Sequence, residues 1–140
     1  KGDPYQWQVE QTVKAVMQGI RGYEDHVLAY QSKVTPVKWL EPTTPSEIEN
    51  AINEDRALVI VPIAFVSDHS ETLVELDIEY QELASELGCQ HYYRSESLNI
   101  DQLFIESLSE IVSESEKIES GNIRQKICPA TFKQCDQELR

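Results

Sequence analysis

The fold of this chain is decided by residues 61–80, which read VPIAFVSDHSETLVELDIEY. The apolar segment at residues 57–65 is rich in β-branched side chains and predicts a strand buried on both faces of a parallel sheet. From residue 68 the hydrophobic period becomes that of an amphipathic helix, which is predicted to end at residue 87, before Gly88. Its apolar stripe consists of Leu73, Leu76, Tyr80, Leu83 and Leu87. The stretch therefore predicts a strand, a tight turn and a long helix.

The turn between this strand and this helix carries Asp68, His69 and Glu71. In open α/β sheets, ligands bind beyond the carboxyl ends of strands, near the first turns of the helices that follow. A purely structural explanation also fits, because Asp68 and Glu71 match a capping box and the helix dipole favours acids in a first turn. The acids on one sector of the helix are typical of a solvated face; they are Asp68, Glu71, Glu75, Glu79, Glu82 and Glu86. Spacing alone leaves both interpretations open.

The remaining segments alternate between helical and strand patterns. Helices are predicted over residues 8–22, 45–53 and 101–115, and strands over residues 27–31 and 90–94. Thr44 or Ser46 is expected to cap the second helix, and Trp7 to pack from the first. This order predicts an α/β fold with an open parallel sheet flanked by helices. One domain is expected over residues 1–116, followed by a polar linker and cysteine-containing tail over residues 117–140.

The composition excludes several classes of partner. The chain has 140 residues, 40% of them hydrophobic, and a formal net charge of −13. Such an acidic chain does not suit nucleic acid or electrostatic adhesion to anionic lipid. No apolar run approaches the roughly 18 residues of a membrane-spanning helix, and no signal peptide is visible. A cytoplasmic protein is expected, and peripheral contact with a membrane stays open.

Two segments together resemble ferrochelatases: QSKVTPVKWLEP at residues 31–42, and the stretch at residues 61–80. GDPY at residues 2–5 and SESLNIDQLFIE at residues 95–106 also follow that family's order and spacing. The resemblance covers nearly the whole chain but matches only the second half of a ferrochelatase. It implies a Rossmann-like chelatase fold of which this chain is the second half, with the missing amino-terminal half of the same protein as its partner.

The resemblance implies a lyase that inserts ferrous iron into protoporphyrin IX, the last step of haem biosynthesis. The pyrrole protons must leave as the metal arrives, which calls for a general base and a metal ligand in one water-poor pocket. In the family's pattern Glu71 contacts the iron and partners a histidine of the upstream half, while Asp68, His69 and Glu75 form the polar wall behind it. No further cofactor is expected to be required. The 140-residue chain alone is expected to be inactive, since half of the pocket wall is missing.

The resemblance also implies residues that bind the porphyrin. Trp39 and Phe65 offer rings on which a flat macrocycle can stack, and Gln31 and Ser32 line the mouth of the pocket. For Trp39 a partly buried core position is the structural alternative. The family usually has glycine where this chain has Thr35, which restricts the backbone of that loop.

The family's helix at this place contains a widened, π-type turn, a distortion often found at functional sites. An ideal α-helix directs Glu71 and Glu75 roughly opposite the apolar stripe. A π-type slip between His69 and Asp77 is therefore expected, and ordinary i to i+4 bonding throughout that span contradicts it.

The tail contains Cys128 and Cys135. Some ferrochelatases bind a 2Fe–2S cluster, which needs four thiolates. These two cysteines are the candidate ligands, but they fall short of that set, and Gln137 stands where clustered relatives carry another cysteine. An anchored tail with Phe132 on a partner surface is expected instead. Two other functions stay open: a related tetrapyrrole chelatase for cobalt or nickel, and a module that binds porphyrin or haem without turnover.

Overall fold

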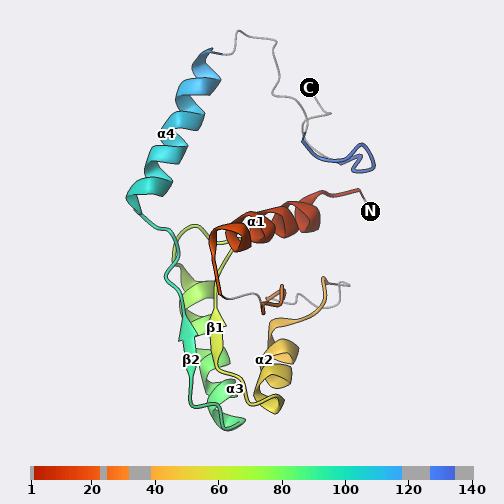
Figure 1. The fold of residues 1–140 in the computed structure, drawn as a ribbon, viewed down its shortest axis with the longest axis vertical. Helices are drawn as coiled ribbons and strands as arrows, with labels where there is room; N and C mark the ends of the chain where they lie inside the picture. Colours follow the sequence, from red (N-terminus) through yellow and green to blue (C-terminus); the bar gives the residue numbers. More distant parts are fainter. Residues whose placement is uncertain (1, 23–24, 32–38, 118–126, 135–140) are drawn as a thin grey trace. The chain divides into compact units, whose positions relative to one another are not determined.

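The computed structural model describes residues 2–22, 25–31, 39–117 and 127–134. Along this part of the chain the elements are α1 (Tyr5–Gly19), α2 (Thr44–Asn53), β1 (Leu58–Ile60), the π-helix η1 (Glu71–Glu79), α3 (Tyr80–Glu86), β2 (Tyr92–Arg94) and α4 (Gln102–Lys117) (Figure 1). This order confirms the predicted α/β class. The chain forms two compact units: residues 12–99, and the described parts of residues 1–11 and 100–140. The domain boundary at residue 117 stays a prediction.

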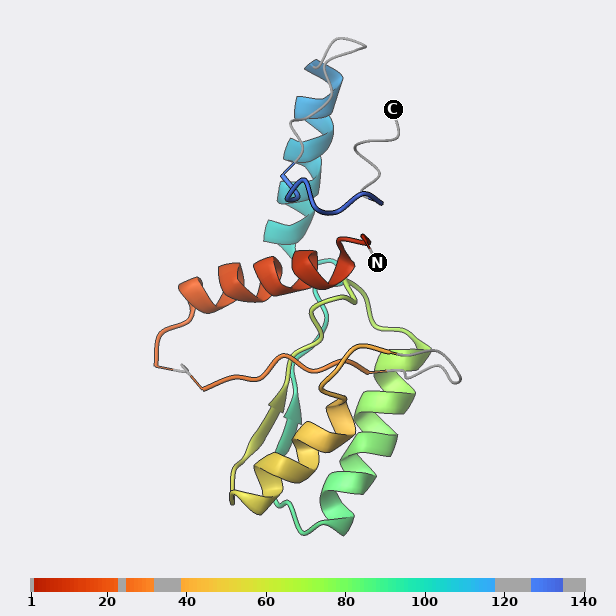
Figure 2. The same cartoon turned by 90° about the vertical axis from the view of Figure 1, so that its right-hand side faces the viewer.

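The two strands of the first unit are parallel, as predicted for the sheet. η1 and α3 connect β1 to β2, which makes a βαβ unit, and α2 lies beside α3 (Figure 2). The paired residues are Leu58 with Tyr92, Val59 with Tyr93, and Ile60 with Arg94.

Two of the predicted strands are wrong in extent. β1 ends at Ile60, not at residue 65, because Pro62 lacks the N–H that a continued ladder needs. It is also not buried on both faces, since Val59 is 65% exposed. The strand predicted at residues 27–31 is reduced to an isolated parallel bridge between Tyr30 and Thr43.

α1 and α2 begin at other residues than predicted, because local hydrogen bonds fix where each helix starts. α1 begins at Tyr5, whose N–H donates to Asp3 Oδ1 at 2.8 Å, and ends three residues before the predicted residue 22. α2 is capped by Thr43, whose side chain accepts from the N–H of Ser46 at 3.4 Å. The expectation that Thr44 or Ser46 caps α2 is therefore wrong.

The helix predicted over residues 68–87 is a π-helix that continues into an α-helix. The Tyr80 N–H donates to the carbonyl of Glu75, which is the i to i+5 spacing of a π-helix. The expected π-type slip is thus confirmed, and the π-helix extends to Glu79, beyond Asp77. α3 ends before Gly88, whose φ of 89° fits the predicted C-terminal glycine.

The capping-box interpretation of the helix start is wrong. η1 begins after Ser70, which makes no side-chain cap. Thr72 satisfies this turn instead: its hydroxyl accepts from the His69 N–H at 2.8 Å and donates to the His69 carbonyl at 2.8 Å. Thr72 is fully buried, so the turn is fixed from inside the fold.

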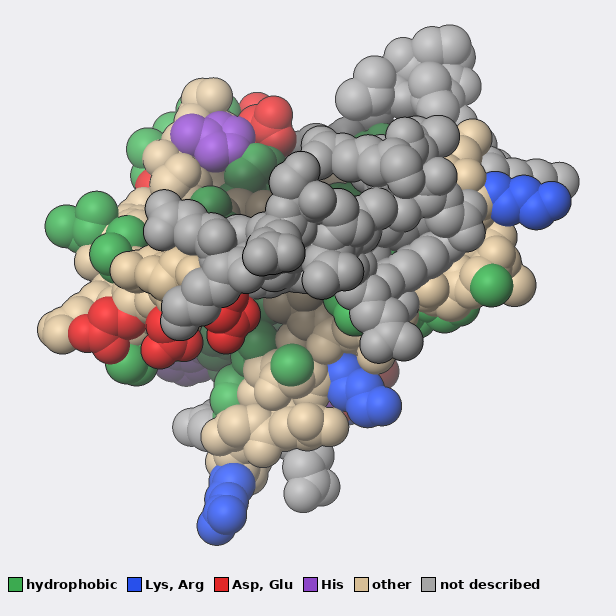
Figure 3. Space-filling model, turned by 90° about the horizontal axis from the view of Figure 1, so that it is seen from above, with side chains coloured by type: hydrophobic (Ala, Val, Ile, Leu, Met, Phe, Trp, Pro, Cys, Tyr) green, Lys and Arg blue, Asp and Glu red, His purple; other side chains and the backbone are tan. Residues whose placement is uncertain are grey.

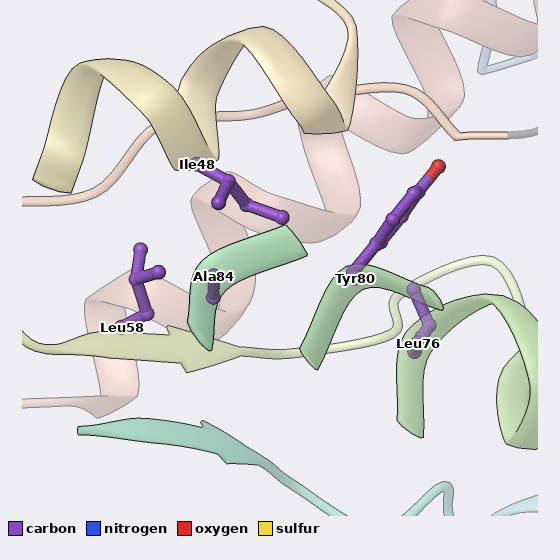
Figure 4. Close-up of a cluster of buried hydrophobic side chains, with 5 residues drawn as sticks. All are labelled: Ile48, Leu58, Leu76, Tyr80 and Ala84. Atoms are coloured by element: carbon purple, nitrogen blue, oxygen red, sulfur yellow. The ribbon is translucent and has the colours of Figure 1, made fainter. Parts of the chain in front are cut away.

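The core of this unit lies between α2, β1 and the η1–α3 helix (Figure 4). Its buried members are Ile48, Leu58, Leu76, Tyr80 and Ala84. Leu76, Tyr80 and Ala84 recur every four residues, whereas Leu73 and Leu87 of the predicted stripe are 47% and 43% exposed. The i to i+5 turns of η1 wind more residues into each turn than an α-helix does, which turns Leu73, three residues before Leu76, away from the face of Leu76.

The second unit joins the two ends of the described chain. The ring centroids of Trp7 and Phe132 are 6.1 Å apart, and the Gln134 N–H donates to the Gly2 carbonyl at 3.0 Å. The expected packing of Trp7 is thus found. Phe132 packs on that ring within the chain, and its expected contact with a partner surface stays a prediction.

The surface reflects the acidic composition. Asp and Glu side chains lie next to one another on the face drawn in Figure 3, in keeping with the net charge of −13. No helix in the described residues is both long and apolar enough to cross a membrane.

Candidate functional site

The turn after β1 brings an aromatic ring against an imidazole. The rings of Phe65 and His69 meet edge to face, with their centroids 4.4 Å apart. The His69 Nδ1 accepts the backbone N–H of Glu71 at 3.3 Å. An accepting Nδ1 places the proton of the neutral imidazole on Nε2. The ring is therefore held in one orientation and one tautomer at the start of η1.

A second group of predicted residues is joined through Glu75. One oxygen of its carboxylate accepts from the Tyr80 hydroxyl at 2.6 Å, and the other accepts from Gln31 Nε2 at 3.1 Å. The Trp39 indole donates to the Gln31 carbonyl at 2.9 Å. The structure thus connects Trp39, Gln31 and Glu75 in one chain of hydrogen bonds.

Sequence reasoning missed the part that Tyr80 has in this chain of hydrogen bonds. The hydrophobic period predicts Tyr80 in the apolar stripe, and the residue is indeed buried, with 7% exposed. A buried tyrosine hydroxyl needs a polar partner. This requirement is the feature from which a polar partner of Tyr80 could have been predicted. Glu75, five positions earlier on the same helix, supplies the acceptor.

Asp68 lies in a third set of contacts, which sequence reasoning also missed. Its Oδ1 is 3.1 Å from Arg94 Nη1, and its Oδ2 accepts from Asn99 Nδ2 at 3.0 Å. The Asp68 N–H donates to Asn99 Oδ1 at 2.9 Å. The hydrogen bond from Asn99, foremost, and the charge of Arg94 lower the pKa of the Asp68 carboxyl below its ordinary value of 3.8. Asp68 is therefore ionised at neutral pH.

The other predicted residues divide into those that the structure describes and those outside it. Glu71 is exposed, and Trp39, Phe65, Gln31 and Glu75 are half-buried. Ser32 and Cys135 lie outside the described residues. Among the residues that are described, no three His, Cys, Asp or Glu side chains come together as a metal-holding group. The assignment of Glu71 to iron stays a prediction.

Cys128 is the one candidate cluster ligand that can be placed. Its side chain is buried, and Gln8 Nε2 donates to its sulfur at 3.9 Å. Such a contact suits a packed side chain as well as a ligand. The interpretation of the tail as an anchor rather than a 2Fe–2S site stays a prediction.

The arrangement provides the elements of acid–base and metal chemistry at one place in the fold. An imidazole of fixed orientation and an exposed carboxylate stand at the first turn of η1, with a phenyl ring against the imidazole. Imidazole nitrogen and carboxylate oxygen are both ligands that Fe²⁺ accepts, and both carry protons.

Comparison with known proteins identifies the family to which these residues belong. The ferrochelatase family model matches residues 1–116. The chain is 48% identical to the ferrochelatase of Pelagibacter ubique over 142 residues, which cover 96% of the chain and 40% of that protein. It is 43% identical to the ferrochelatase of Rickettsia bellii over 141 residues, with the same coverage of 96% and 40%. It is 51% identical to the ferrochelatase of a Sulfurihydrogenibium species over 112 residues, which cover 79% of the chain and 33% of that protein.

The chain spans well under half the length of the curated relatives that it matches, with 40% in the first two and 33% in the third. The family match contains every candidate residue at the start of η1 and both aromatic candidates, Trp39 and Phe65.

Proposed function

This chain belongs to the ferrochelatase family, and we propose that the full-length protein inserts ferrous iron into protoporphyrin IX to form haem. In this lyase reaction iron and porphyrin are both substrates. The two pyrrole N–H protons leave as Fe²⁺ takes their place, so charge balances without an oxidant. The family match over residues 1–116 is the observation that carries the proposal.

The chemistry is assigned to the first turn of η1. Glu71 is the residue that contacts the iron and accepts a pyrrole proton, which its exposed carboxylate supports. His69 stands beside it with Nδ1 occupied by the Glu71 N–H, which leaves Nε2 to face the reactants. Glu75 is held by Tyr80 and Gln31 and acts one turn further along the helix.

The porphyrin is proposed to stack on Trp39 and Phe65, with Gln31 and Ser32 at the mouth of the pocket. The hydrogen bond from the Trp39 indole to the Gln31 carbonyl supports this grouping, because it ties an aromatic candidate to a polar one. The remaining pocket wall comes from the other half of the protein, in keeping with the partial coverage of the relatives. We place the reaction in the cytoplasm, a reducing compartment in which a thiol such as that of Cys89 stays unoxidised.

The test compares two Glu→Gln variants of the full-length protein. Glu71→Gln removes the proposed base and iron ligand. Glu82→Gln is the control, because it removes an exposed acid from α3, which continues directly from η1. The rate of ferrous or zinc insertion into protoporphyrin is measured for each by porphyrin absorbance. We expect Glu71→Gln to lower kcat by about a hundredfold or more, the usual contribution of a positioned proton acceptor, and Glu82→Gln to change it less than about twofold.

Three outcomes contradict parts of the proposal. An unchanged rate in Glu71→Gln eliminates the role of that carboxylate. Cobalt or nickel insertion well above ferrous insertion in the unsubstituted protein identifies a different tetrapyrrole chelatase. Porphyrin binding without insertion of any of these metals identifies a binding module.

A further inference from the structure

Arg94 connects the loop before η1 with the interior of η1. Its side chain is only 12% exposed and lies at the end of β2. Nη1 is 3.1 Å from Asp68 Oδ1, while Nη2 donates to Asp77 Oδ2 at 2.8 Å and Nε donates to the other Asp77 oxygen. One guanidinium thus holds two carboxylates, one that precedes Glu71 in the sequence and one that follows it.

The pairing with Asp77 is bidentate along one edge of the guanidinium, from Nε and Nη2. Two parallel N–H to oxygen bonds fix the orientation of the carboxylate as well as its distance. Lysine offers a single ammonium and cannot reproduce this geometry. The remaining nitrogen of Arg94 reaches Asp68, so all three guanidinium nitrogens have an assigned partner.

The loop after β2 also holds Asp68 in place, through Asn99. Asn99 binds both the Asp68 carboxylate and the Asp68 N–H, at 3.0 and 2.9 Å. Asp68 is therefore held on both oxygens and on its backbone. A carboxylate occupied in this way is a poor proton acceptor, and its contribution is to fix the position of the chain immediately before His69.

The bridge is compatible with one helical register only. If an i to i+5 turn of η1 relaxes to i to i+4, the residues after it rotate by about 100° relative to those before it. Asp77 then turns away from the guanidinium that also holds Asp68. The ion pairs of Arg94 therefore favour the π-helical form over the α-helical one.

We propose that Arg94 is a positioning residue of the site: by bridging Asp68 and Asp77 it keeps η1 in its π-helical register and so fixes where Glu71 and His69 lie. The effect on catalysis rests on the proposed function. The effect on the register of η1 does not.

The test uses Arg94→Lys in the full-length protein, with Arg56→Lys as the matched control. Arg56 also pairs with two acids, Asp25 and Glu54, but its side chain is 48% exposed and neither acid belongs to η1. Three quantities are measured: kcat and KM for metal insertion, and amide hydrogen exchange of residues 71–79 by mass spectrometry. Asp77→Asn is the second variant, and it serves if Arg94→Lys fails to fold. It is a milder change, because asparagine keeps the size of the side chain and one oxygen acceptor.

We expect Arg94→Lys to lower kcat by at least about tenfold, since misplacement of a reacting group by about 1 Å has effects of this size or larger. KM for the porphyrin is expected to change less than about threefold, because the stacking residues are untouched. Exchange in residues 71–79 is expected to rise selectively. Arg56→Lys should leave all three quantities unchanged, and Asp77→Asn should repeat the pattern of Arg94→Lys.

The possible failures are distinguishable. Exchange and kcat that both stay at the level of the unsubstituted protein overturn the positioning role. A rise in exchange spread over α2 and α3 as much as over η1 also overturns it, because it shows general destabilisation. If the unsubstituted protein inserts no metal, the proposed function fails, and the exchange measurement still decides whether Arg94 fixes the register of η1.

Discussion

At the scale of single residues, the contacts of Asp68 change what its carboxylate can do. The sequence placed it among the catalytic acids, beside His69 and Glu71. In the fold both of its oxygens accept hydrogen bonds, from Arg94 and from Asn99. These bonds favour the ionised form and bind it to the protein, so we expect Asp68 to act through stability and position.

The pH dependence of stability tests this interpretation of Asp68. The pKa of the folded Asp68 is below its ordinary value of 3.8, so its stabilising contribution is present above pH 3.8 and is lost as the pH falls through the folded value. We expect Asp68→Asn to be less stable than the unsubstituted protein at neutral pH, and the two to converge in acid. Urea unfolding at a series of pH values between about 7 and about 2 measures the difference.

The exposed residue Asp55 provides the control for the loss of one charge, as Asp55→Asn. Its positive φ of 57° is one that asparagine adopts readily. A stability difference between the Asp68 variant and the unsubstituted protein that is the same at every pH contradicts the assignment.

The residues of the site were predictable to the extent that short segments contain them. His69, Glu71 and Glu75 lie within one stretch, and in the fold Gln31, from the other segment, donates to Glu75. Arg94 and Asn99 were not predictable, because they reach Asp68 across a strand pairing that no local spacing reveals. Their roles depend on the register in which Ile60 pairs with Arg94.

At the scale of elements, the sequence predicted the order of helices and strands better than their extents. The parallel pairing of β1 and β2 and the long helix between them were predicted from apolar runs and their period. β1 is shorter than predicted, because Pro62 interrupts a run whose residues otherwise favour a strand. The apolar stripe failed at Leu73 for a different reason: it assumed the number of residues per turn of an α-helix, whereas η1 winds more residues into each turn.

A hydrogen bond between β2 and η1 gives a prediction at this scale. The Tyr92 hydroxyl donates to the carbonyl of Leu76 at 2.6 Å, and Leu76 is buried. Tyr92→Phe leaves that carbonyl without this donor. We expect the free energy of unfolding to fall by about 1 to 2 kcal/mol at neutral pH, measured by urea denaturation. Tyr93→Phe, at a position that is 58% exposed, should change it little.

The hydrogen bond from Tyr92 also makes the stability depend on pH in the alkaline range. Burial, with a smaller contribution from the negative charge of Asp77, raises the pKa of Tyr92 from 10.0 to about 12. A raised folded pKa means that the stabilisation is complete below pH 10 and is lost as the pH rises toward 12. The stability difference between the unsubstituted protein and Tyr92→Phe should therefore shrink over that interval. A difference that persists unchanged at the upper end contradicts the assignment.

At the scale of the whole molecule, the described chain consists of two units with different bases for their stability. The unit of residues 12–99 has the buried cluster around Leu76 and Tyr80. The other unit depends on contacts between distant ends of the sequence, such as Trp7 with Phe132. Periodicity could indicate that Trp7 packs, but not on which residue, because a pairing over that separation leaves no pattern along the chain.

The contact between the rings gives a prediction for this second unit. A contact between two aromatic rings at such a separation, 6.1 Å between centroids, adds about 0.5 to 1.5 kcal/mol beyond the area that it buries. Phe132→Ala should therefore release the neighbouring segment more often, and trypsin should cleave after Lys133 about fivefold faster or more in the full-length protein, since cleavage follows the population of the open form. Leu103→Ala, at a position 73% exposed on α4, provides the control and should leave this cleavage unchanged. Equal rates in Phe132→Ala and in the unsubstituted protein would mean that the ring contact does not hold the tail, and that the hydrogen bonds at Gly2 and Cys128 are sufficient to do so.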